Sequence, residues 1–422
     1  MRLTADQLTP LGADGMLVHF VDTAFLGKSP ETVGVAVSGG GDSMALLNVT
    51  KMWADLAGTS VKAVTVDHGL RPEAATEAQM VAAFCEDCGI SHSVITWDGA
   101  AATGNLPAAA RKARYRLIAD WAKDNDVGAV LLGHTVDDVA ETFVMRLARK
   151  SGVDGLALMD TQFDRHDVQW ARPLWQQSRA DLRDHLNRHD VPWVDDPTNE
   201  DDAFERSRTR KALKVLSDLE IDTDVLKSVA IHMAGARGAL EYYTAKAARD
   251  VAREEGGDVL IDTRPTPPLP PDIQRRLLVG ALMYVGGKAL PPRADAVMDL
   301  EIGLMQAGKH TLAGCVITQE DHRLRISREL QAVKNIAAPS GHTWDGRWQI
   351  LGEAQDGLSI RALGEAIREV PDWRDTGLPR ASLMVTPAVF RGDWLVAAPV
   401  AGLQNGFEAR IVADFASFLE SR

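Results

Sequence analysis

The fold is decided by one stretch of sequence, VGVAVSGGGDS at residues 33–43. Its first five residues are small, apolar and partly β-branched, which predicts a short buried strand. Three glycines follow, and the Ala- and Leu-rich segment 43–56 then predicts a helix. Glycines let the backbone approach an anion closely, and a helix N-terminus offers that anion free N–H groups and a positive dipole end. With the hydroxyl groups of Ser38 and Ser43 as further donors, the stretch predicts a phosphate-binding loop.

The alternation of strand and helix continues from this loop to about residue 175. Further strands are predicted at 61–66, 92–96, 128–132 and 168–171, and further helices at 73–88, 107–123 and 137–148. Strands that alternate with helices of ten or more residues are typical of βαβ crossovers. We therefore expect an α/β fold in this region, with a doubly wound, mainly parallel sheet.

The rest of the chain has a different pattern. A long helix is predicted at 224–255, a proline-rich linker or elbow at 263–272, a helix at 273–285 and paired strands at 311–317 and 324–327. We expect three domains: an N-terminal catalytic domain (1–215), a mostly helical middle domain (216–335) and a small α+β C-terminal domain (336–422).

Composition excludes several classes of protein. The 422 residues are 45% hydrophobic and 25% charged, which excludes wholesale disorder and fibrous structure. We expect a cytoplasmic protein, because no apolar run is long enough to span a bilayer, the first residues lack a signal core and three cysteines suit a reducing compartment. The net charge of −13 argues weakly against a nucleic-acid partner, but basic clusters lie at 111–116, 146–150, 172–188 and 206–214.

A second chemical motif, GHTVDDVAET, occupies residues 133–142 after a predicted strand. On one continuous helix, His134, Asp137, Asp138 and Glu141 would share a face. Like charges at that spacing repel one another, so a cation is expected there. This motif lacks the H-E-x-x-H pattern and the Cys/His pairings of zinc sites, whereas carboxylates beside a phosphate site suit Mg²⁺, for which Asp42 and Asp138 are the candidate ligands.

The glycine loop lacks the lysine of the Walker A motif and the spacing of the dinucleotide fingerprint. Its residues Ser38, Gly39, Gly40, Gly41, Asp42 and Ser43 resemble the S-G-G-x-D-S loop of the N-type ATP pyrophosphatases. That family cleaves ATP between its α- and β-phosphates and adenylates an acceptor oxygen.

Within that superfamily, the order of further motifs resembles the tRNA(Ile)-lysidine synthetase family. The run from His134 to Thr142 is similar to its H-x-x-D-D-x-x-E-T motif. Similar segments start at Asp67 (D-H-x-L-R), at Asn105 (through Arg111 and Arg114), at Arg172 (R-P-L), at Trp193 (W-x-x-D-P-[ST]-N) and at Arg206 (through Arg210). Ser207 departs from the pattern, because the family usually has Asn there.

The resemblance implies that ATP adenylates C2 of the wobble cytidine, position 34, of a CAU-anticodon tRNA(Ile), and that free L-lysine then displaces AMP to form lysidine. Asp137 would be the base that deprotonates lysine, with Asp138 and Glu141 orienting lysine, Mg²⁺ or the cytosine, and with His134 also in the catalytic group. Asp42 would help to place metal or pyrophosphate. Contacts with substrate or tRNA would come from Asp67, Asn105, Arg111, Arg114, Arg206 and Arg210. The implied cofactors are ATP and Mg²⁺; the oligomeric state stays open, with a homodimer as one option.

Three alternatives remain at this point. A tRNA 2-thiocytidine synthase would use an iron–sulfur cluster, for which Cys85, Cys88 and Cys315 are available, although a position of Cys85 in a helix core is the better interpretation. A non-catalytic RNA-binding protein and a ligase for a small metabolite are the others.

Both domains after residue 215 would bind tRNA under this resemblance. Arg325 and Arg347 are among several basic residues that could contact phosphate. Trp344, Trp348 and Trp394 are expected in the core of the last domain rather than as platforms for bases.

Overall fold

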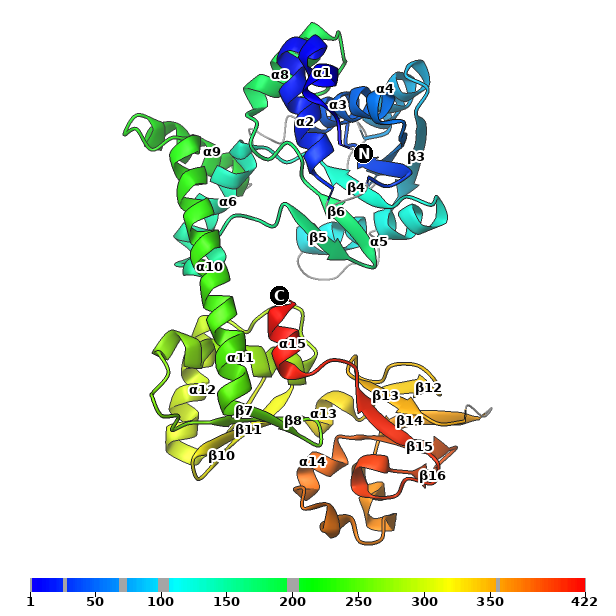
Figure 1. Cartoon of the computed structure of the whole chain (residues 1–422), viewed down its shortest axis with the longest axis vertical. Helices are drawn as coiled ribbons and strands as arrows, with labels where there is room; N and C mark the ends of the chain where they lie inside the picture. The colour runs from blue at the N-terminus through cyan, green and yellow to red at the C-terminus, as the bar shows by residue number, and fades with distance from the viewer. Residues whose placement is uncertain are drawn as a thin grey trace. The chain divides into compact units, whose positions relative to one another are not determined.

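The computed structural model describes residues 2–25, 29–67, 74–97, 106–195, 205–353 and 357–421. The chain folds into two compact units, 1–237 and 238–422 (Figure 1). The predicted boundaries at 215 and 335 stay predictions. Within the described ranges, none of the helices combines the length and the apolar character needed to cross a bilayer.

A six-stranded sheet forms the centre of the first unit, with the strand order β3-β2-β1-β4-β6-β5. All neighbours in it are parallel except β5 and β6. The strands are β1 (Thr32–Ala36), β2 (Ser60–Asp67), β3 (Ser91–Thr96), β4 (Ala129–Leu132), β5 (Gln162–Arg165) and β6 (Val168–Ala171). The expectation of a doubly wound, mainly parallel sheet is therefore confirmed.

Helices cover both faces of this sheet. One face carries α2 (Gly15–Thr23), α3 (Gly41–Ala57), α4 (Ala74–Asp87) and α8 (Arg179–Arg188), which share a hydrophobic core with β1. The opposite face carries α5 (Leu106–Asp124), whose apolar residues pack on β4 and β6. The unit also contains α1 (Ala5–Leu8), η1 (Thr9–Asp14), α6 (Val136–Ala148), α7 (Val153–Leu156), α9 (Glu205–Ser217) and the first part of α10 (Thr223–Val251).

Strand β5 was not predicted. It has the polar sequence QFDR and lies at the edge of the sheet, so its composition shows no apolar alternation. It joins β6 through His166 and Asp167, whose φ angles of 55° and 59° are those of a tight hairpin turn.

The second unit begins with the last part of α10 and contains an antiparallel five-stranded sheet. Its strand order is β7-β8-β11-β10-β9. The strands are β7 (Ala252–Glu255), β8 (Asp258–Asp262), β9 (Lys309–Leu312), β10 (Cys315–Glu320) and β11 (Arg323–Arg328). Helices α11 (Pro271–Gly286), α12 (Ala294–Ala307) and α15 (Phe415–Glu420) pack on it.

The structure refines two expectations for this region. The helix predicted to reach residue 255 ends at Val251, and the next four residues form β7. The proline-rich segment 263–272 connects β8 to α11 inside one compact unit and therefore does not separate domains.

Two further sheets complete the second unit. One has the order β12-β14-β15-β16 and the other pairs β13 with β17. Their elements are β12 (Ala337–Pro339), β13 (Trp348–Leu351), β14 (Leu358–Ala362), β15 (Pro387–Arg391), β16 (Trp394–Ala397) and β17 (Glu408–Ile411), with α13 (Leu330–Val333), α14 (Arg380–Met384), η4 (Gly364–Glu369), η5 (Trp373–Thr376) and η6 (Pro399–Ala401) between them.

Trp344 and Trp348 lie in the core of this part, as expected. The expectation for Trp394 was wrong, since this side chain starts the edge strand β16 and is 80% exposed. Arg325 and Arg347, named as possible phosphate contacts, do not lie on the surface. Both are buried; Arg325 pairs with Asp258, and Arg347 donates to the carbonyl of Gly257.

Candidate active site

The glycine loop connects β1 to α3 at the carboxyl end of the strand. Gly39 has a φ of +86°, which favours glycine, and Gly40 is the N-cap of α3. The hydroxyl of Ser43 donates to the carbonyl of Gly40 at 2.9 Å and accepts from the N–H of Ser38 at 3.1 Å. These two hydrogen bonds hold the loop in a tight turn, with the N-terminus of α3 facing the space that the loop encloses.

The loop before α6 packs directly against this phosphate loop. A Cβ atom on Gly133 would come within 2.9 Å of the carbonyl oxygen of Asp42 and within 3.0 Å of the Cα of Ser43, so the contact needs glycine. Strands β1 and β4, which precede the two loops, are adjacent and parallel. The chain runs from β1 to β2 on one side and places β4 on the other, so the loops meet at the topological switch point of the sheet.

Helix α6 begins at Val136, one residue before the predicted start at 137. Its N-cap is Thr135, which forms a capping box with Asp138: the N–H of Thr135 donates to Asp138 Oδ2 at 2.9 Å. His134 precedes the cap, so the expectation that it shares a helical face with the three acidic residues was wrong. Asp138 also stabilises the helix, because one of its carboxylate oxygens accepts the capping hydrogen bond at the N-terminus of α6.

The cation that the acidic residues require is Arg179, the first residue of α8. Its guanidinium lies 2.7 Å from Glu141 Oε1, 2.9 Å from Asp138 Oδ1 and 3.2 Å from Asp42 Oδ2. Its backbone N–H donates to Asp137 Oδ2 at 2.9 Å. One arginine thus connects all four predicted carboxylates, from the phosphate loop and from α6.

Sequence reasoning missed this role of Arg179. The residue belongs to the basic cluster 172–188, but none of the quoted motifs contains it. The repulsion among the acidic residues was the one signal that a cation lies nearby. The signal could not say which of the chain's basic residues supplies it.

Glu141 is the most buried of the carboxylates, with no exposed side-chain surface. Arg210 Nε lies 2.6 Å from its Oε1, and Arg206 Nε lies 3.8 Å from its Oε2. The structure therefore brings the predicted residues Arg206 and Arg210, both from α9, to the acidic group. Arg206 remains about half exposed and can turn toward a ligand.

The carboxylates differ in how easily they take up a proton. Burial, with the nearby charges of Asp138 and Asp137, raises the pKa of Asp42, although Arg179 opposes the shift. Burial works in the same direction on Asp138, but Arg179, His134 and the N–H of Thr135 outweigh it and lower its pKa. Arg179 stays charged: burial acts to lower its pKa, but Asp138, Glu141 and Asp42 raise it.

His134 is neutral at physiological pH. Burial and the charge of Arg172 lower its pKa to about 3. Its Nδ1 is buried and has no hydrogen-bond partner among the residues that the structure describes. That nitrogen is available to a ligand.

The other predicted contact residues are placed as follows. Asp67 is the last residue of β2, at the same carboxyl edge of the sheet as the glycine loop. The guanidinium of Arg111 lies 5.4 Å from the ring centre of Tyr115, and burial lowers the pKa of Arg114, with Arg111 and Arg206 adding to the shift. Asn105 lies outside the described residues.

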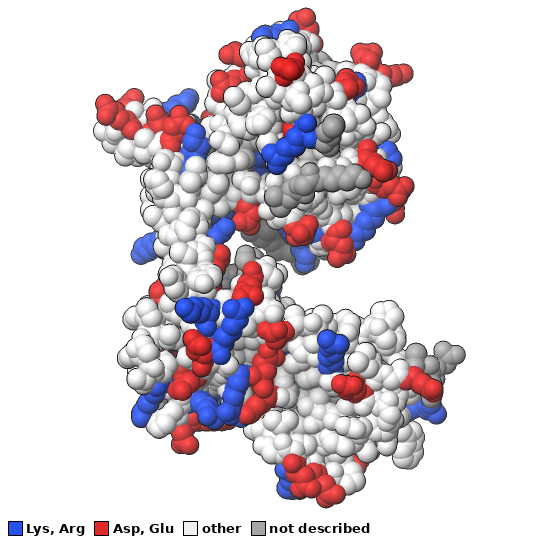
Figure 2. Space-filling model, viewed as in Figure 1, with Lys and Arg blue, Asp and Glu red and all other residues white. Residues whose placement is uncertain are grey.

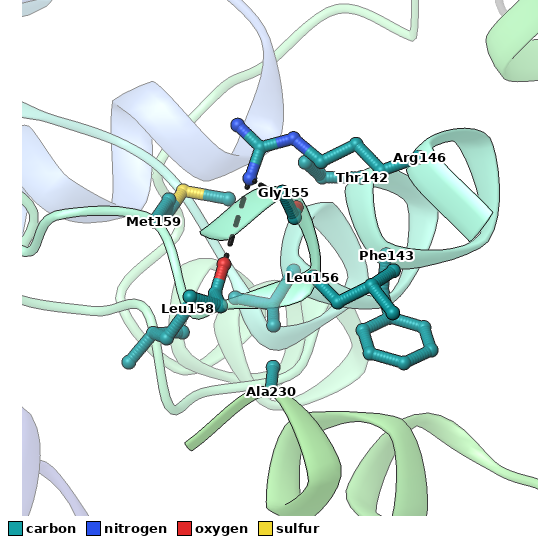
Figure 3. Close-up of a pocket in the computed structure, with 10 residues that line it drawn as sticks. Thr142, Phe143, Arg146, Gly155, Leu156, Leu158, Met159 and Ala230 are labelled. Atoms are coloured by element: carbon teal, nitrogen blue, oxygen red, sulfur yellow. Dashed lines mark hydrogen bonds between the residues drawn. The ribbon is translucent and has the colours of Figure 1, made fainter. Parts of the chain in front are cut away.

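The opposite side of α6 is fixed by packing. Val139, Phe143 and Arg146 surround a cavity of about 10 Å³ together with residues of the α7 region and Ala230 (Figure 3). That volume holds at most one water molecule, so the cavity is no substrate site. Arg146 donates to the carbonyl of Gly155 at 2.9 Å and thereby holds α6, with its acidic face, in place.

The cysteines do not form a metal site among the described residues. Cys85 is buried in α4, where burial raises its pKa to about 12, and burial likewise raises the pKa of the nearby Cys88. Cys315 belongs to the core of the second unit. Thiols with raised pKa values are poor thiolate ligands, which agrees with the packing interpretation.

The PP-loop domain family matches residues 16–216. A tRNA(Ile)-lysidine synthase of Ruegeria pomeroyi is 42% identical over 415 residues, which cover 98% of this chain and 99% of that protein. The chain belongs to the tRNA(Ile)-lysidine synthase family. Enzymes of the same name from Wolbachia pipientis and Mesorhizobium japonicum are 34% and 37% identical, over 81% and 92% of this chain and 82% and 88% of theirs.

Proposed function

We propose that this chain is an ATP-dependent ligase that converts the wobble cytidine, position 34, of CAU-anticodon tRNA(Ile) to lysidine, with free L-lysine as the second substrate. The observation that carries the proposal is the similarity to tRNA(Ile)-lysidine synthases over nearly the whole chain, combined with the contact between the phosphate loop and the acidic start of α6.

In the first step, O2 of the cytosine attacks the α-phosphorus of ATP, and the bond to the β-phosphate breaks. Gly39, Gly40 and the N-terminus of α3 would hold the departing pyrophosphate, because this end of the helix attracts anions. Arg111 and Arg114 would offset phosphate charge as it develops. The neutral His134 would offer its unpartnered Nδ1 to the base or to the nucleotide.

In the second step, the ε-nitrogen of lysine attacks C2, and the C2–O bond to AMP breaks. A lysine ammonium has a pKa near 10.4, so it must lose a proton before it attacks. Asp137 is the proposed acceptor of that proton, since among the described residues its carboxylate accepts a hydrogen bond only from the backbone N–H of Arg179. Asp138 and Glu141 would help to orient lysine; both carboxylates also pair with Arg179.

The residues fit Mg²⁺ by their chemistry, because Asp42 and Asp138 offer hard carboxylate oxygens next to the phosphate loop. Both also contact Arg179, and the contact with Asp42 is the longest that its guanidinium makes, at 3.2 Å. Asp42 would therefore be the first to exchange this contact for a metal. Mg²⁺ bound with ATP would neutralise charge on the leaving pyrophosphate.

The second unit is proposed to bind the body of the tRNA. On the face drawn in Figure 2, blue and red side chains alternate over residues 238–422 and form no continuous basic stripe. Recognition there would depend on local contacts. Trp394 is the strongest candidate, because an exposed aromatic ring can stack on an unpaired base.

The decisive experiment is incubation of the purified chain with unmodified tRNA(Ile), ATP and lysine, followed by mass spectrometry of the nucleosides. A lysidine peak that needs all three substrates is expected. Asp137→Asn should abolish it, whereas Arg183→Gln, an exposed residue on α8, should not. A 2-thiocytidine peak with a sulfur donor, or no modified cytidine, would contradict the proposal.

A further inference from the structure

A cluster of potential metal ligands lies at the end of α8 opposite Arg179. His185 Nδ1 lies 2.7 Å from Asp14 Oδ1, and His189 Nε2 lies 2.7 Å from Asp14 Oδ2. Asp14 is the last residue of η1, so the cluster joins the N-terminal segment to α8. The three ligand atoms lie within 4.8 Å of one another, and no other such group occurs among the described residues.

The two histidines reach the same point because His189, the C-cap of α8, follows His185 by four residues, about one helical turn. His185 is fully buried and Asp14 nearly so, whereas the side chain of His189 is about one-third exposed. An ion could therefore enter from the side of His189 and bind at a position that is largely shielded from solvent.

A contact on the other side of His185 fixes its orientation. His185 Nε2 lies 2.8 Å from Oδ1 of Asn48, a residue of α3, and the oxygen can only accept. The Nε2 nitrogen therefore carries the hydrogen. In a neutral ring, Nδ1 would then carry a lone pair, and the Asp14 oxygen that it faces at 2.7 Å is also an acceptor. Two acceptors this close repel each other, so a proton or a cation must lie between them.

We propose that Asp14, His185 and His189 bind one Zn²⁺ ion that clamps the N-terminal segment onto α8. Two imidazole nitrogens and one carboxylate oxygen are ligands that zinc prefers, and a water molecule would complete four-coordination. The hydrogen bond from His185 to Asn48 is the kind of outer contact that orients a histidine ligand.

Binding requires a small local adjustment. Zinc–nitrogen bonds of ~2.0–2.1 Å place tetrahedral ligands roughly 3.3 Å apart, so the 2.7 Å contact between the ligating oxygen of Asp14 and its histidine would open by about 0.6 Å. Arg188, which lies 2.5 Å from Asp14 Oδ1, competes with the metal for this oxygen. Its side chain is 41% exposed and can turn into solvent.

The clamp would bear on the active site through the helix itself. Arg179 and His185 are six residues apart, roughly 9 Å along α8. An ion that fixes one end of this short helix thus fixes the arginine that holds the four carboxylates. The site is independent of the proposed reaction, since zinc would be structural and would not touch substrate.

The test uses the full chain without a histidine tag, stripped with a chelator and then titrated with Zn²⁺. We expect one tightly bound zinc per chain and a rise in Tm of about 5 °C or more at saturation. Less than half an equivalent of zinc and an unchanged Tm in the wild-type chain would overturn the proposal, whatever the variants do.

Three variants separate a metal site from an ion-pair cluster. His189→Gln should lose the zinc and the Tm response, whereas His232→Gln, an exposed histidine on α10, should keep both. Arg188→Gln should bind zinc at least as tightly as the wild type. If Arg188→Gln lowers Tm and zinc does not raise it again, the cluster is held by charge pairs alone, and the proposal is wrong.

Cobalt substitution tests whether the metal binds at Cys85 and Cys88 instead. Co²⁺ at the proposed site should give weak visible bands without thiolate charge-transfer absorption, and His189→Gln should remove them. Thiolate bands, or zinc retained in His189→Gln, would place the metal elsewhere and contradict the proposal.

Discussion

The guanidinium of Arg179 lies 2.7 Å from the carboxylate of Glu141, a side chain with no exposed surface. The same arginine reaches Asp42 in the phosphate loop, 137 residues away in sequence. A single side chain on α8 thus connects the two motifs that the sequence placed at the active site.

Replacing Arg179 by Gln should lower both stability and activity. The change removes the positive charge shared by Asp42, Asp138 and Glu141, of which, within the described ranges, only Glu141 keeps a close arginine partner, Arg210. We expect a cost of about 3–5 kcal/mol, or a Tm lower by roughly 6–20 °C. Lysidine formation should fall about 10-fold or more, because the carboxylates would take up protons. Thermal melts and initial rates measure the two effects. Arg183→Gln, which removes an exposed pair with Asp195 on the same helix, should change Tm by about 1–2 °C at most; equal effects of the two changes would contradict the assignment.

Gly133→Ala should separate the phosphate loop from α6. Its Cβ would meet backbone atoms of Asp42 and Ser43, which cannot turn away, so we expect a cost of about 1–3 kcal/mol and ATP affinity reduced about 10-fold or more. Calorimetric titration with ATP measures the affinity. Gly235→Ala is the matched control, because nothing lies within 4 Å of its Cβ in α10 and alanine favours a helix.

His134 should make stability depend on pH. The pKa of the ring is 6.5 in the unfolded chain and about 3 in the folded chain, so the unfolded state binds more protons between these values. The stability that His134 contributes is present above pH 6.5 and is lost as the pH falls toward 3. Denaturant melts of wild type and His134→Gln between pH 7.5 and 4 measure it. The wild type should lose stability faster than the variant; parallel curves would exclude a neutral buried imidazole.

Trp394→Ala should weaken tRNA binding about 10-fold and leave ATP binding unchanged, since base–aromatic stacking contributes about 1–3 kcal/mol. Filter binding with unmodified tRNA(Ile) measures the affinity. Met305→Ala, at an equally exposed apolar side chain on α12, serves as the control. The same affinity for Trp394→Ala and wild type would remove the tryptophan from the proposed tRNA surface.

Truncation after residue 335 should damage the second unit as a whole. Phe415 and Leu419 of α15 belong to the same core as α11, and Arg328 pairs with Asp345 across the proposed boundary. We therefore expect the truncated chain to lose tRNA binding and to expose apolar surface, measured by dye binding, while ATP binding in the first unit persists. A truncated chain without new apolar surface would support an independent domain after 335.

The sequence predicted the parallel sheet and the phosphate loop because both depend on local composition: apolar runs, glycines and helical periodicity. The start of α6 was predicted to within one residue, and Thr135 and Asp138 have the spacing of a capping box, but the acidic periodicity wrongly included His134, which lies before the cap. The partner of the carboxylates was not predictable, because Arg179 meets them only through the packing of α8 on α3.

In the second unit, too, the sequence did not predict which residues are exposed and which are buried. Trp394 and Trp348 both begin short strands, and their sequences do not reveal that the side chain of Trp394 is exposed whereas that of Trp348 lies in a core. Arg325 looked like any surface arginine, although Asp258, Glu255 and Glu320 surround it. Long-range pairing decides such cases.

Helix α8 carries Arg179 at its first residue and His185 about one and a half turns later, and His189 is its C-cap. Each inserted or deleted residue between these ends would swing one of them through about 100° around the axis. Length variation should therefore be tolerated in many surface loops of this enzyme, whereas residues 180–184 should accept almost no change in number. Leu182, which is buried in the core, should also resist polar substitution.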